Sequence, residues 1–223
     1  MREKLILFPF GGNALEAVDC LGDEFELIGF IDDSSEKHGR SASFEVHSRE
    51  LLERYPEAKV LAVPGSPTSY RYRRDAIASL GVREDRFARV IHPRATVANR
   101  RTIGFNTLLM AGVVVTSNAQ IGNHVCILPN SVIHHDAVIQ DYVLIGSNVT
   151  VAGHVVVGAQ SYIGSGSTLI DHSEIRENAL VSSGSNVIGP VPPLGGWRTG
   201  DGAQLPRDGG TRWVFRARMS LPL

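Results

Sequence analysis

The sequence predicts a small α/β domain followed by a parallel β-helix. An aliphatic residue recurs at every sixth position from 91 to 187 without interruption, a period typical of short strands wound into coils. The chain has 23 glycines among 223 residues and only 7% aromatic residues, a composition that suits tight turns around a narrow interior. The residues before the repeat alternate strand-like and helix-like segments, which is typical of a parallel sheet.

In the N-terminal part, apolar runs predict strands, and the segments between them predict helices. The strands are expected at residues 4–10, 26–32, 59–64 and 86–91, and the helices at 13–21, 48–55 and 67–80. Asn13 is the expected N-cap of the first helix. This alternation indicates a small sheet of Rossmann type, in which ligands bind at the carboxyl ends of the strands.

Polar and glycine residues stand at those carboxyl ends. Gly11, Gly12 and Asn13 follow the first strand, and Asp32 and Asp33 end the second. Glycines that open a helix can hold a phosphate through backbone N–H groups, and either aspartate can hydrogen-bond a ribose or a base edge. The alternative is that the aspartates begin a solvated loop. The chain has no GxGxxG pattern, which argues against a dinucleotide cofactor.

The repeat has two regular positions in each hexapeptide. The first is aliphatic, and the residue four places later is small or valine, with Arg101 as the exception. The aliphatic series is Ile91, Val97, Ile103, Leu109, Val115, Ile121, Ile127, Ile133, Ile139, Ile145, Val151, Val157, Ile163, Leu169, Ile175, Val181 and Val187. Three hexapeptides make one triangular coil of 18 residues, so that residues 97–187 hold five coils and the repeat ends before Gly189–Pro193. Residues 18 apart stack at about 4.8 Å, like neighbouring strands.

Composition and charge exclude several classes of protein. The 22 Lys and Arg residues balance 23 Asp and Glu, for a net charge of −1, whereas nucleic-acid and membrane-surface binders usually carry a basic excess. The two cysteines, Cys20 and Cys126, form no CxxC pair, so neither a disulfide framework nor a cysteine zinc site is expected. No apolar run approaches the ~20 residues of a membrane span. We therefore expect a cytoplasmic protein that binds neither nucleic acid nor membranes.

Three motifs together carry a resemblance to a known family. They are the hexapeptides, the Ile-Asp-Asp run ending at Asp33, and the Val-Ile-His-Pro run at residues 90–93. Over residues 4–204 the chain resembles the left-handed β-helix acyltransferases of the hexapeptide-repeat superfamily. Within that superfamily it resembles the bacterial nucleotide-sugar N-acyltransferases, relatives of the bacillosamine-pathway acetyltransferase and the sialic-acid O-acetyltransferases.

The resemblance implies an organisation and an activity. Residues 1–90 would bind a nucleotide-linked amino-deoxy sugar, residues 91–190 would form the left-handed β-helix acyltransferase domain, and residues 191–223 would be a C-terminal tail near the coenzyme A site. Acetyl-CoA, or another acyl-CoA, would be a co-substrate, with no tightly bound cofactor. The family also implies a homotrimer, which would cover apolar residues expected to face outward, such as Met110, Leu128 and Leu144.

The run Val-Ile-His-His-Asp-Ala-Val-Ile at residues 132–139 matches the family's catalytic segment. The match implies that His135 is the general base and that Asp136 orients it. Gly153 lies one coil away from His135, where a missing side chain would leave room for a thioester. Ala152 and Gly153 match the segment whose backbone contacts the acyl donor. Histidine is the usual general base at neutral pH, so His135 suits the acyl-transfer reaction. His134 is its neighbour in the sequence and is a weaker candidate for a direct role.

Near the C-terminus, arginines offer partners for the coenzyme A phosphates. Arg198 and Arg207 are the expected ones, with Arg212 as a further candidate. The alternative for residues 212–218 is a strand that caps the open end of the prism.

The chain departs from the family near the acceptor. Leu128 and Leu144 stand where relatives commonly carry Asn and a second His, and Gly12-Asn13-Ala14 replaces a Gly-His-Gly run. The resemblance therefore supports acyl transfer as the reaction better than it supports the family's usual sugar as the acceptor. Both an amine and a hydroxyl acceptor stay open.

Two other readings of the β-helix remain. Asn118, Asp136, His154 and His172 form one 18-residue column, whose imidazoles could bind zinc as in the γ-class carbonic anhydrases. A straight column suits tetrahedral geometry poorly, so no metal is expected. The last reading is a non-catalytic binding or assembly protein.

For the acyltransferase, Cys126 has no histidine as its sequence neighbour, which favours direct transfer in a ternary complex.

Overall fold

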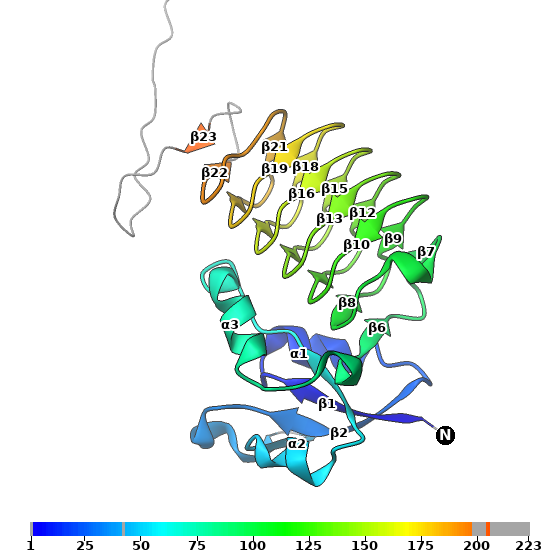
Figure 1. Ribbon diagram of the computed structural model, residues 1–223, viewed down its shortest axis with the longest axis vertical. Helices are drawn as coiled ribbons and strands as arrows, with labels where there is room; N and C mark the ends of the chain where they lie inside the picture. The colour runs from blue at the N-terminus through cyan, green and yellow to red at the C-terminus, as the bar shows by residue number, and fades with distance from the viewer. Residues whose placement is uncertain (1, 42, 198–203, 206–223) are drawn as a thin grey trace, which may run out of the picture.

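The computed structural model describes residues 2–41, 43–197 and 204–205. An α/β domain lies at one end of a stack of short-stranded coils (Figure 1). The coils are three sheets of short strands, parallel except for the last pair, that form a left-handed β-helix, as expected. Within the described part, no helix is long and apolar enough to cross a membrane.

The N-terminal sheet has five strands in the order β3-β4-β2-β1-β5. Its strands are β1 (Glu3–Phe8), β2 (Phe25–Ile31), β3 (Gly39–Ser41), β4 (Phe44–His47) and β5 (Lys59–Ala62), and its helices are α1 (Gly12–Val18), α2 (Glu50–Arg54) and α3 (Arg73–Ala78). Short 3₁₀ turns lie at η1 (Ser35–Lys37), η2 (Tyr70–Tyr72), η3 (Glu84–Arg86) and η4 (Arg100–Thr102). The parallel pairs β1–β2, β1–β5 and β2–β4 confirm the Rossmann-like sheet.

The sequence missed one element of this domain, and two of the expectations about it were wrong in detail. The antiparallel β3–β4 pair was not predicted, because β3 has only three residues, none with an apolar side chain, and β4 has only four. Gly11, not Asn13, is the N-cap of α1. The helix expected over residues 67–80 begins only with η2 at Tyr70, because the Ser66 carbonyl accepts hydrogen bonds from the Ser69 and Tyr70 N–H groups and forms a turn there.

The coils have an eight-stranded, a six-stranded and a four-stranded face. The eight-stranded face contains β6 (Arg89–Ile91), β8 (Thr107–Leu109), β11 (Cys126–Ile127), β14 (Leu144–Ile145), β17 (Tyr162–Ile163), β20 (Leu180–Val181), β22 (Gly196–Trp197) and β23 (Gln204–Leu205). The six-stranded face contains β7 (Thr96–Val97), β9 (Val114–Val115), β12 (Val132–Ile133), β15 (Thr150–Val151), β18 (Thr168–Leu169) and β21 (Asn186–Val187). The four-stranded face contains β10 (Gln120–Ile121), β13 (Val138–Ile139), β16 (Val156–Val157) and β19 (Glu174–Ile175).

The 18-residue register holds through the stack. Ile127 pairs with Ile145 and Ile133 with Val151, and the aliphatic series forms one continuous buried core. The structure extends the repeat beyond its expected end at Val187: Val191 bridges Ile175 and Trp197 pairs with Val181, and both side chains are buried. The partners in each pair are separated by 16 residues, so the last coil is two residues shorter than the others. The six-residue period therefore does not extend into it.

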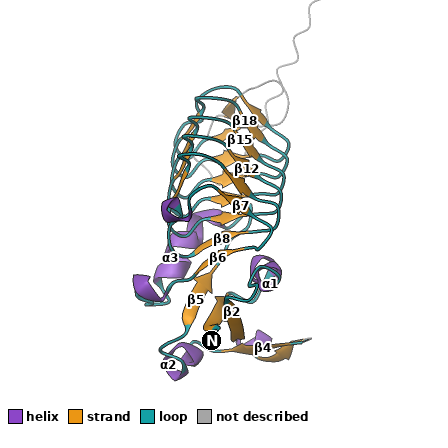
Figure 2. Ribbon diagram, turned by 90° about the vertical axis from the view of Figure 1, so that its right-hand side faces the viewer, coloured by secondary structure: helices purple, strands orange, loops and turns teal. Residues whose placement is uncertain are grey.

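The N-terminal domain packs against the eight-stranded face of its own chain. Met110 and Leu144 are only 1% and 2% exposed, and they share one apolar cluster with Ala14, Ala17 and Tyr70. Leu128 is partly buried against the same cluster. Helices α1 and α3 lie on the side of the N-terminal sheet toward the coils (Figures 1 and 2). The three side chains therefore face out of the coils, as expected, but the expectation that a second copy must cover them was wrong, because the chain's own domain covers them.

Candidate active site

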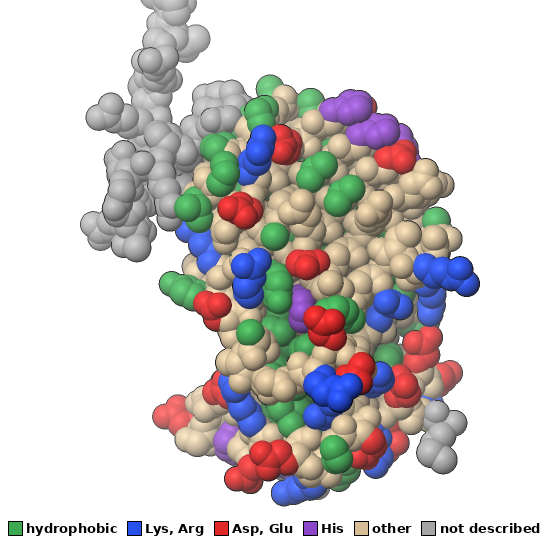
Figure 3. Space-filling model, in the orientation of Figure 1, with side chains coloured by type: hydrophobic (Ala, Val, Ile, Leu, Met, Phe, Trp, Pro, Cys, Tyr) green, Lys and Arg blue, Asp and Glu red, His purple; other side chains and the backbone are tan. Residues whose placement is uncertain are grey.

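His135 and Asp136 lie in a turn between β12 and β13, at the corner where the six-stranded and four-stranded faces meet. In a triangular coil this corner is opposite the eight-stranded face, which the N-terminal domain covers. The side chains of His135 and Asp136 are 55% and 38% exposed. Figure 3 shows histidine side chains gathered beside an acidic one at the upper right edge of the coils.

The two side chains contact each other as expected. His135 Nδ1 lies 2.8 Å from Asp136 Oδ2, and Asn118 donates a hydrogen bond of 3.1 Å to Asp136 Oδ1. The hydrogen bond from His135, followed by that from Asn118, lowers the pKa of the Asp136 carboxyl. When Nδ1 donates to the carboxylate, Nε2 carries the lone pair and can take a proton. The pair therefore has the arrangement of an oriented general base.

Gly153 contacts His135 directly, but not in the way that the sequence suggested. A Cβ atom on Gly153 would lie 2.7 Å from His135 Cε1, 2.8 Å from His135 Nε2 and 3.1 Å from Asp171 Oδ1. The space that the missing side chain leaves is thus filled by the imidazole itself, and not left open for a thioester. Gly153 allows the ring to lie against the next coil.

The backbone around Gly153 offers one donor beside the imidazole. The Ala152 N–H donates to Leu169 O within the coil stack, so it is already used. In the ranges that the structure describes, no hydrogen bond is made by the Gly153 N–H. A backbone N–H next to a base is the type of donor that stabilises a developing oxyanion.

The column predicted from 18-residue spacing is present. The rings of His135 and His154 are 5.2 Å apart at 86°, and those of His154 and His172 stack at 4.8 Å. Ligand atoms of His135, Asp136 and His154 lie within 4.8 Å of one another. Zinc, with ligand bonds of about 2.0–2.2 Å, would draw these atoms closer together. That no metal binds here stays a prediction.

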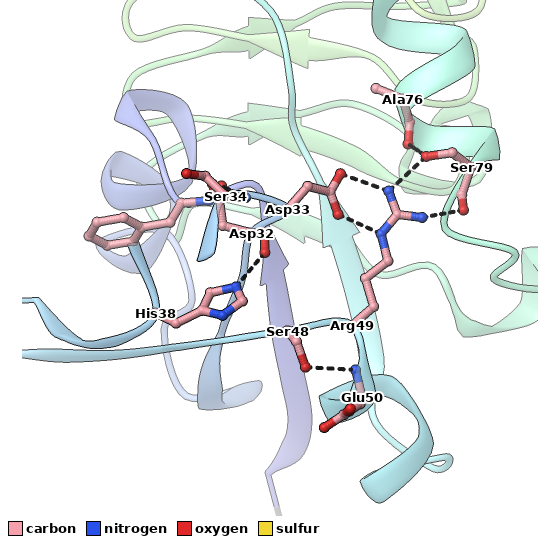
Figure 4. Close-up of polar contacts among 10 residues, drawn as sticks. Asp32, Asp33, Ser34, His38, Ser48, Arg49, Glu50, Ala76 and Ser79 are labelled. Carbon is pink, nitrogen blue, oxygen red and sulfur yellow. Dashed lines mark hydrogen bonds and ion pairs between the residues drawn. The ribbon is translucent and has the colours of Figure 1, made fainter. Parts of the chain in front are cut away.

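At the carboxyl edge of the N-terminal sheet, Asp32 organises the loops. Its side chain is 6% exposed and accepts hydrogen bonds from the backbone N–H groups of Phe10 and Ser34, at 3.0 and 2.9 Å. Lys37 Nζ lies 2.9 Å from the same carboxylate, and His38 Nε2 lies 2.8 Å from the Asp32 carbonyl oxygen (Figure 4). Asp32 therefore ties the glycine loop to the end of β2, and the alternative of a solvated aspartate is wrong for this residue.

Asp33 is paired with Arg49, the N-cap residue of α2. Arg49 makes two hydrogen bonds to the Asp33 carboxylate, of 2.6 and 2.7 Å, and a third to Ser79 Oγ at 3.0 Å (Figure 4). The hydrogen bonds from Arg49 lower the pKa of the Asp33 carboxyl. The side chain is still 56% exposed, so one edge of the carboxylate faces solvent.

Gly11, Gly12 and Asn13 reach the same edge. A Cβ on either glycine would meet nothing within 4 Å, so the space beside this backbone is open. Asn13 Nδ2 donates to the Val63 and Gly65 carbonyl oxygens at 3.3 and 3.2 Å. The structure thus brings together the loops after β1, β2 and β5, as expected of a Rossmann-like ligand edge.

Other expected residues take no part or lie elsewhere. Arg198, Arg207, Arg212 and residues 212–218 lie outside the described residues. Cys126 is fully buried, and burial raises the pKa of its thiol to about 12, which suits no nucleophile. Sequence reasoning gave Asn118 no role at the base, although the 18-residue spacing already placed it beside Asp136.

Comparisons with known proteins support the repeat and the fold. The family model described as bacterial transferase hexapeptide (six repeats) matches residues 102–135 and 136–171. No curated protein sequence matches the chain. The matched residues lie within the hexapeptide repeat that the structure shows wound into a β-helix.

Several solved structures match most of the chain, the N-terminal domain as well as the coils. The acetyltransferase domain of PglB from Neisseria gonorrhoeae, in complex with acetyl coenzyme A, has a TM-score of 0.75 at 22% identity, over 89% of this chain and 97% of that one. A mutant of perosamine N-acetyltransferase from Caulobacter crescentus, in complex with CoA and GDP-perosamine, has a TM-score of 0.75 at 20% identity, over 89% and 94%. WeeI from Acinetobacter baumannii has a TM-score of 0.67 at 20% identity, over 88% and 96%. The chain shares the complete two-part fold of these proteins.

Proposed function

We propose that the protein transfers an acyl group, acetyl in the simplest case, from coenzyme A to the amine of a nucleotide-linked amino-deoxy sugar. The observation that carries the proposal is His135, held by Asp136 at 2.8 Å and packed on Gly153, whose N–H is unused among the described residues. Two solved proteins with this fold form complexes with acetyl coenzyme A, or with CoA and GDP-perosamine. Acyl-CoA is a co-substrate in this proposal, with no tightly bound cofactor.

The mechanism we propose is direct transfer in a ternary complex. His135 Nε2 takes a proton from the acceptor amine as the nitrogen attacks the thioester carbonyl carbon. The Gly153 N–H donates to the oxyanion of the tetrahedral intermediate. The C–S bond then breaks, and the imidazolium returns the proton to the leaving thiolate of coenzyme A. Asp136 keeps the imidazole in the required tautomer and stabilises its positive form.

The acceptor would bind at the carboxyl edge of the N-terminal sheet. The open backbone of Gly11 and Gly12 suits a diphosphate, and Asp32 orders the loop while Asp33 and Asn13 line the same edge. In this division residues 1–90 bind the nucleotide sugar, residues 91–190 carry the base, and residues 191–223, including Arg198 and Arg207, would contact coenzyme A.

We also propose that the active site forms between copies of the chain, in a homotrimer. The corner with His135 lies opposite the face on which the N-terminal domain packs. One copy alone therefore keeps its acceptor edge away from its own base, and a neighbour's base would meet it instead. Sedimentation of the protein should give a trimer, and a monomer that turns over substrate would contradict this assembly.

The test is calorimetric titration with acetyl-CoA, then with UDP-, TDP- and GDP-linked amino sugars, followed by assay of coenzyme A release. Wild type and His135→Ala should both bind acetyl-CoA, whereas turnover should fall by about 10²- to 10⁴-fold in the variant. Glu53→Ala, an exposed change on α2, serves as the matched control. Failure of every coenzyme A thioester to bind would overturn the proposal that the protein is an acyltransferase and would favour a binding or assembly role.

A further inference from the structure

Arg73, the first residue of α3, carries a positive charge in the interior. It is 1% exposed, and none of the carboxylates in the described ranges forms an ion pair with it. Burial lowers the pKa of its guanidinium. A buried arginine without an acidic partner is costly unless its N–H groups find other acceptors, so its partners are informative.

Those partners are three backbone carbonyl oxygens from two parts of the molecule. Nη1 donates to Pro64 O, in the loop after β5 of the N-terminal sheet. Nη2 donates to His124 O at 2.7 Å, and Nε to Tyr142 O at 3.2 Å. His124 and Tyr142 lie at equivalent turns of successive coils, so a single side chain joins the N-terminal domain to two coils.

The residues around Arg73 extend this contact along the stack. Tyr70 Oη and Arg71 Nη2 each donate to Asn178 O at 3.2 Å, and Gln160 Nε2 donates to Arg71 O at 3.2 Å. The four turn residues of this docking column, at equivalent positions of successive coils, all have a left-handed φ between 55° and 63°. They are His124, Tyr142, Gln160 and Asn178. Residues 70–74 thus lie along four coils.

On its other side, Arg73 holds the loop that ends β5. Gly65 has a φ of +124°, and a Cβ there would lie 2.9 Å from Arg73 Cγ, so the arginine packs against this backbone. Asn13 donates to the carbonyl oxygens on both sides, Val63 and Gly65. The loop is therefore held between Asn13, from α1, and Arg73, which is itself bound to the coils.

We propose that Arg73 is a positioning residue that fixes the 63–66 loop, and with it the acceptor edge, relative to the coils. The part that concerns the acceptor rests on the proposed function. Three N–H groups of one planar guanidinium meet three carbonyl groups in fixed directions. A lysine has one compact ammonium on a flexible stem and cannot reproduce this fork, and a methionine leaves all three carbonyl oxygens without a donor.

The first test needs no substrate. Hydrogen exchange is measured on the full-length protein for wild type, Arg73→Lys, Arg73→Met and the control Arg83→Met, whose side chain is 81% exposed and pairs only with Asp85 among the described residues. In both Arg73 variants, amide exchange over residues 63–74 should rise at least about tenfold, while β2 and the coils beyond residue 144 keep the wild-type rates. Unchanged exchange in a folded Arg73→Lys would overturn the proposal. Arg73→Lys is the deciding variant if Arg73→Met fails to fold.

The second test separates positioning from general stability. In Arg73→Lys the KM for the nucleotide sugar should rise about tenfold, while the KM for acetyl-CoA stays within about twofold, and Arg83→Met should match wild type in both. Equal rises in the two KM values, or no change despite faster exchange, would show that Arg73 only stabilises the fold. A wild type that turns over no nucleotide sugar would refute the proposed function instead, and hydrogen exchange would then decide the placement of the loop alone.

Discussion

Substitution of Gly153 by alanine tests the candidate base through the space that its ring occupies. The new Cβ would lie 2.7 Å from His135 Cε1 and 2.8 Å from His135 Nε2, whereas non-bonded carbon atoms approach to about 3.5 Å at best. The imidazole must therefore move by about 0.8 Å or rotate away from Gly153. Misplacement of a catalytic group by about 1 Å costs on the order of 10²-fold in rate, or about 2.7 kcal/mol of activation free energy.

The same substitution should leave the fold intact. Gly153 lacks a left-handed φ, and the atoms that a Cβ would meet first belong to the exposed side chains of His135 and Asp171. These side chains can rotate into solvent, so the free energy of unfolding should change by less than about 1 kcal/mol. Activity and stability should therefore separate in this variant.

The assay is coenzyme A release under saturating acetyl-CoA, together with thermal unfolding. Gly189→Ala is the matched control, because Gly189 lies two coils further along the same column and its Cβ would meet nothing within 4 Å. We expect a kcat about 10²-fold lower in Gly153→Ala and near wild type in Gly189→Ala. A Gly153→Ala protein with kcat within about threefold of wild type would refute the reasoning, because an imidazole that can be displaced without loss is no general base.

Three further outcomes follow from the structure. Asp136→Asn removes the charge opposite His135 Nδ1, so kcat should fall by about 10- to 100-fold with acetyl-CoA affinity retained; an unchanged kcat would remove Asp136 from the mechanism. Burial lowers the pKa of His124 from 6.5 to about 4, so the unfolded chain binds a proton on this residue more readily than the native state does. The contribution of this residue to the free energy of unfolding is then complete above pH 6.5 and falls by up to about 3 kcal/mol between pH 6.5 and 4. In urea titrations at several pH values, His124→Gln should make the unfolding free energy depend less on pH over this range. A dependence equal to that of wild type would contradict the lowered pKa of His124. Cys126→Ala should keep coenzyme A release within about twofold, because burial raises the pKa of this thiol to about 12 and leaves almost no thiolate at neutral pH; complete loss of transfer in a folded variant would point to a covalent intermediate.

The repeat is the part of the fold that the sequence predicted best. The first position of each hexapeptide, such as Ile133, is aliphatic at every step, because stacked coils place residues 18 apart in contact within an apolar interior. The second position also admits buried serines, such as Ser131, whose hydroxyl hydrogen-bonds with backbone groups. This regular period predicted the three sheets, their 18-residue register and the neighbouring positions of His135, Gly153 and Asp171 in successive coils. The last coil escaped it, because Val191 and Trp197 keep the interior filled with two residues fewer.

The N-terminal elements were less predictable. Short helices such as α1 and α3 have few residues over which a period can be counted, and their ends depend on hydrogen bonds to distant segments. Asn13 illustrates the difficulty. Its residue type is favoured at N-caps, but its side chain donates to the carbonyl oxygens of Val63 and Gly65, which are 50 and 52 positions away along the chain.

For the candidate site, the sequence by itself determined which residues share a corner, because a fixed coil length converts spacing into neighbourhood. It could not determine that the imidazole fills the space above Gly153, since that depends on the side-chain torsions of His135. Nor could it determine that the N-terminal domain covers Leu144 and Met110 and that Arg73 joins the two parts. Such contacts link segments with no common period, so only the tertiary structure, in which burial and unpaired carbonyl groups must be satisfied together, decides them.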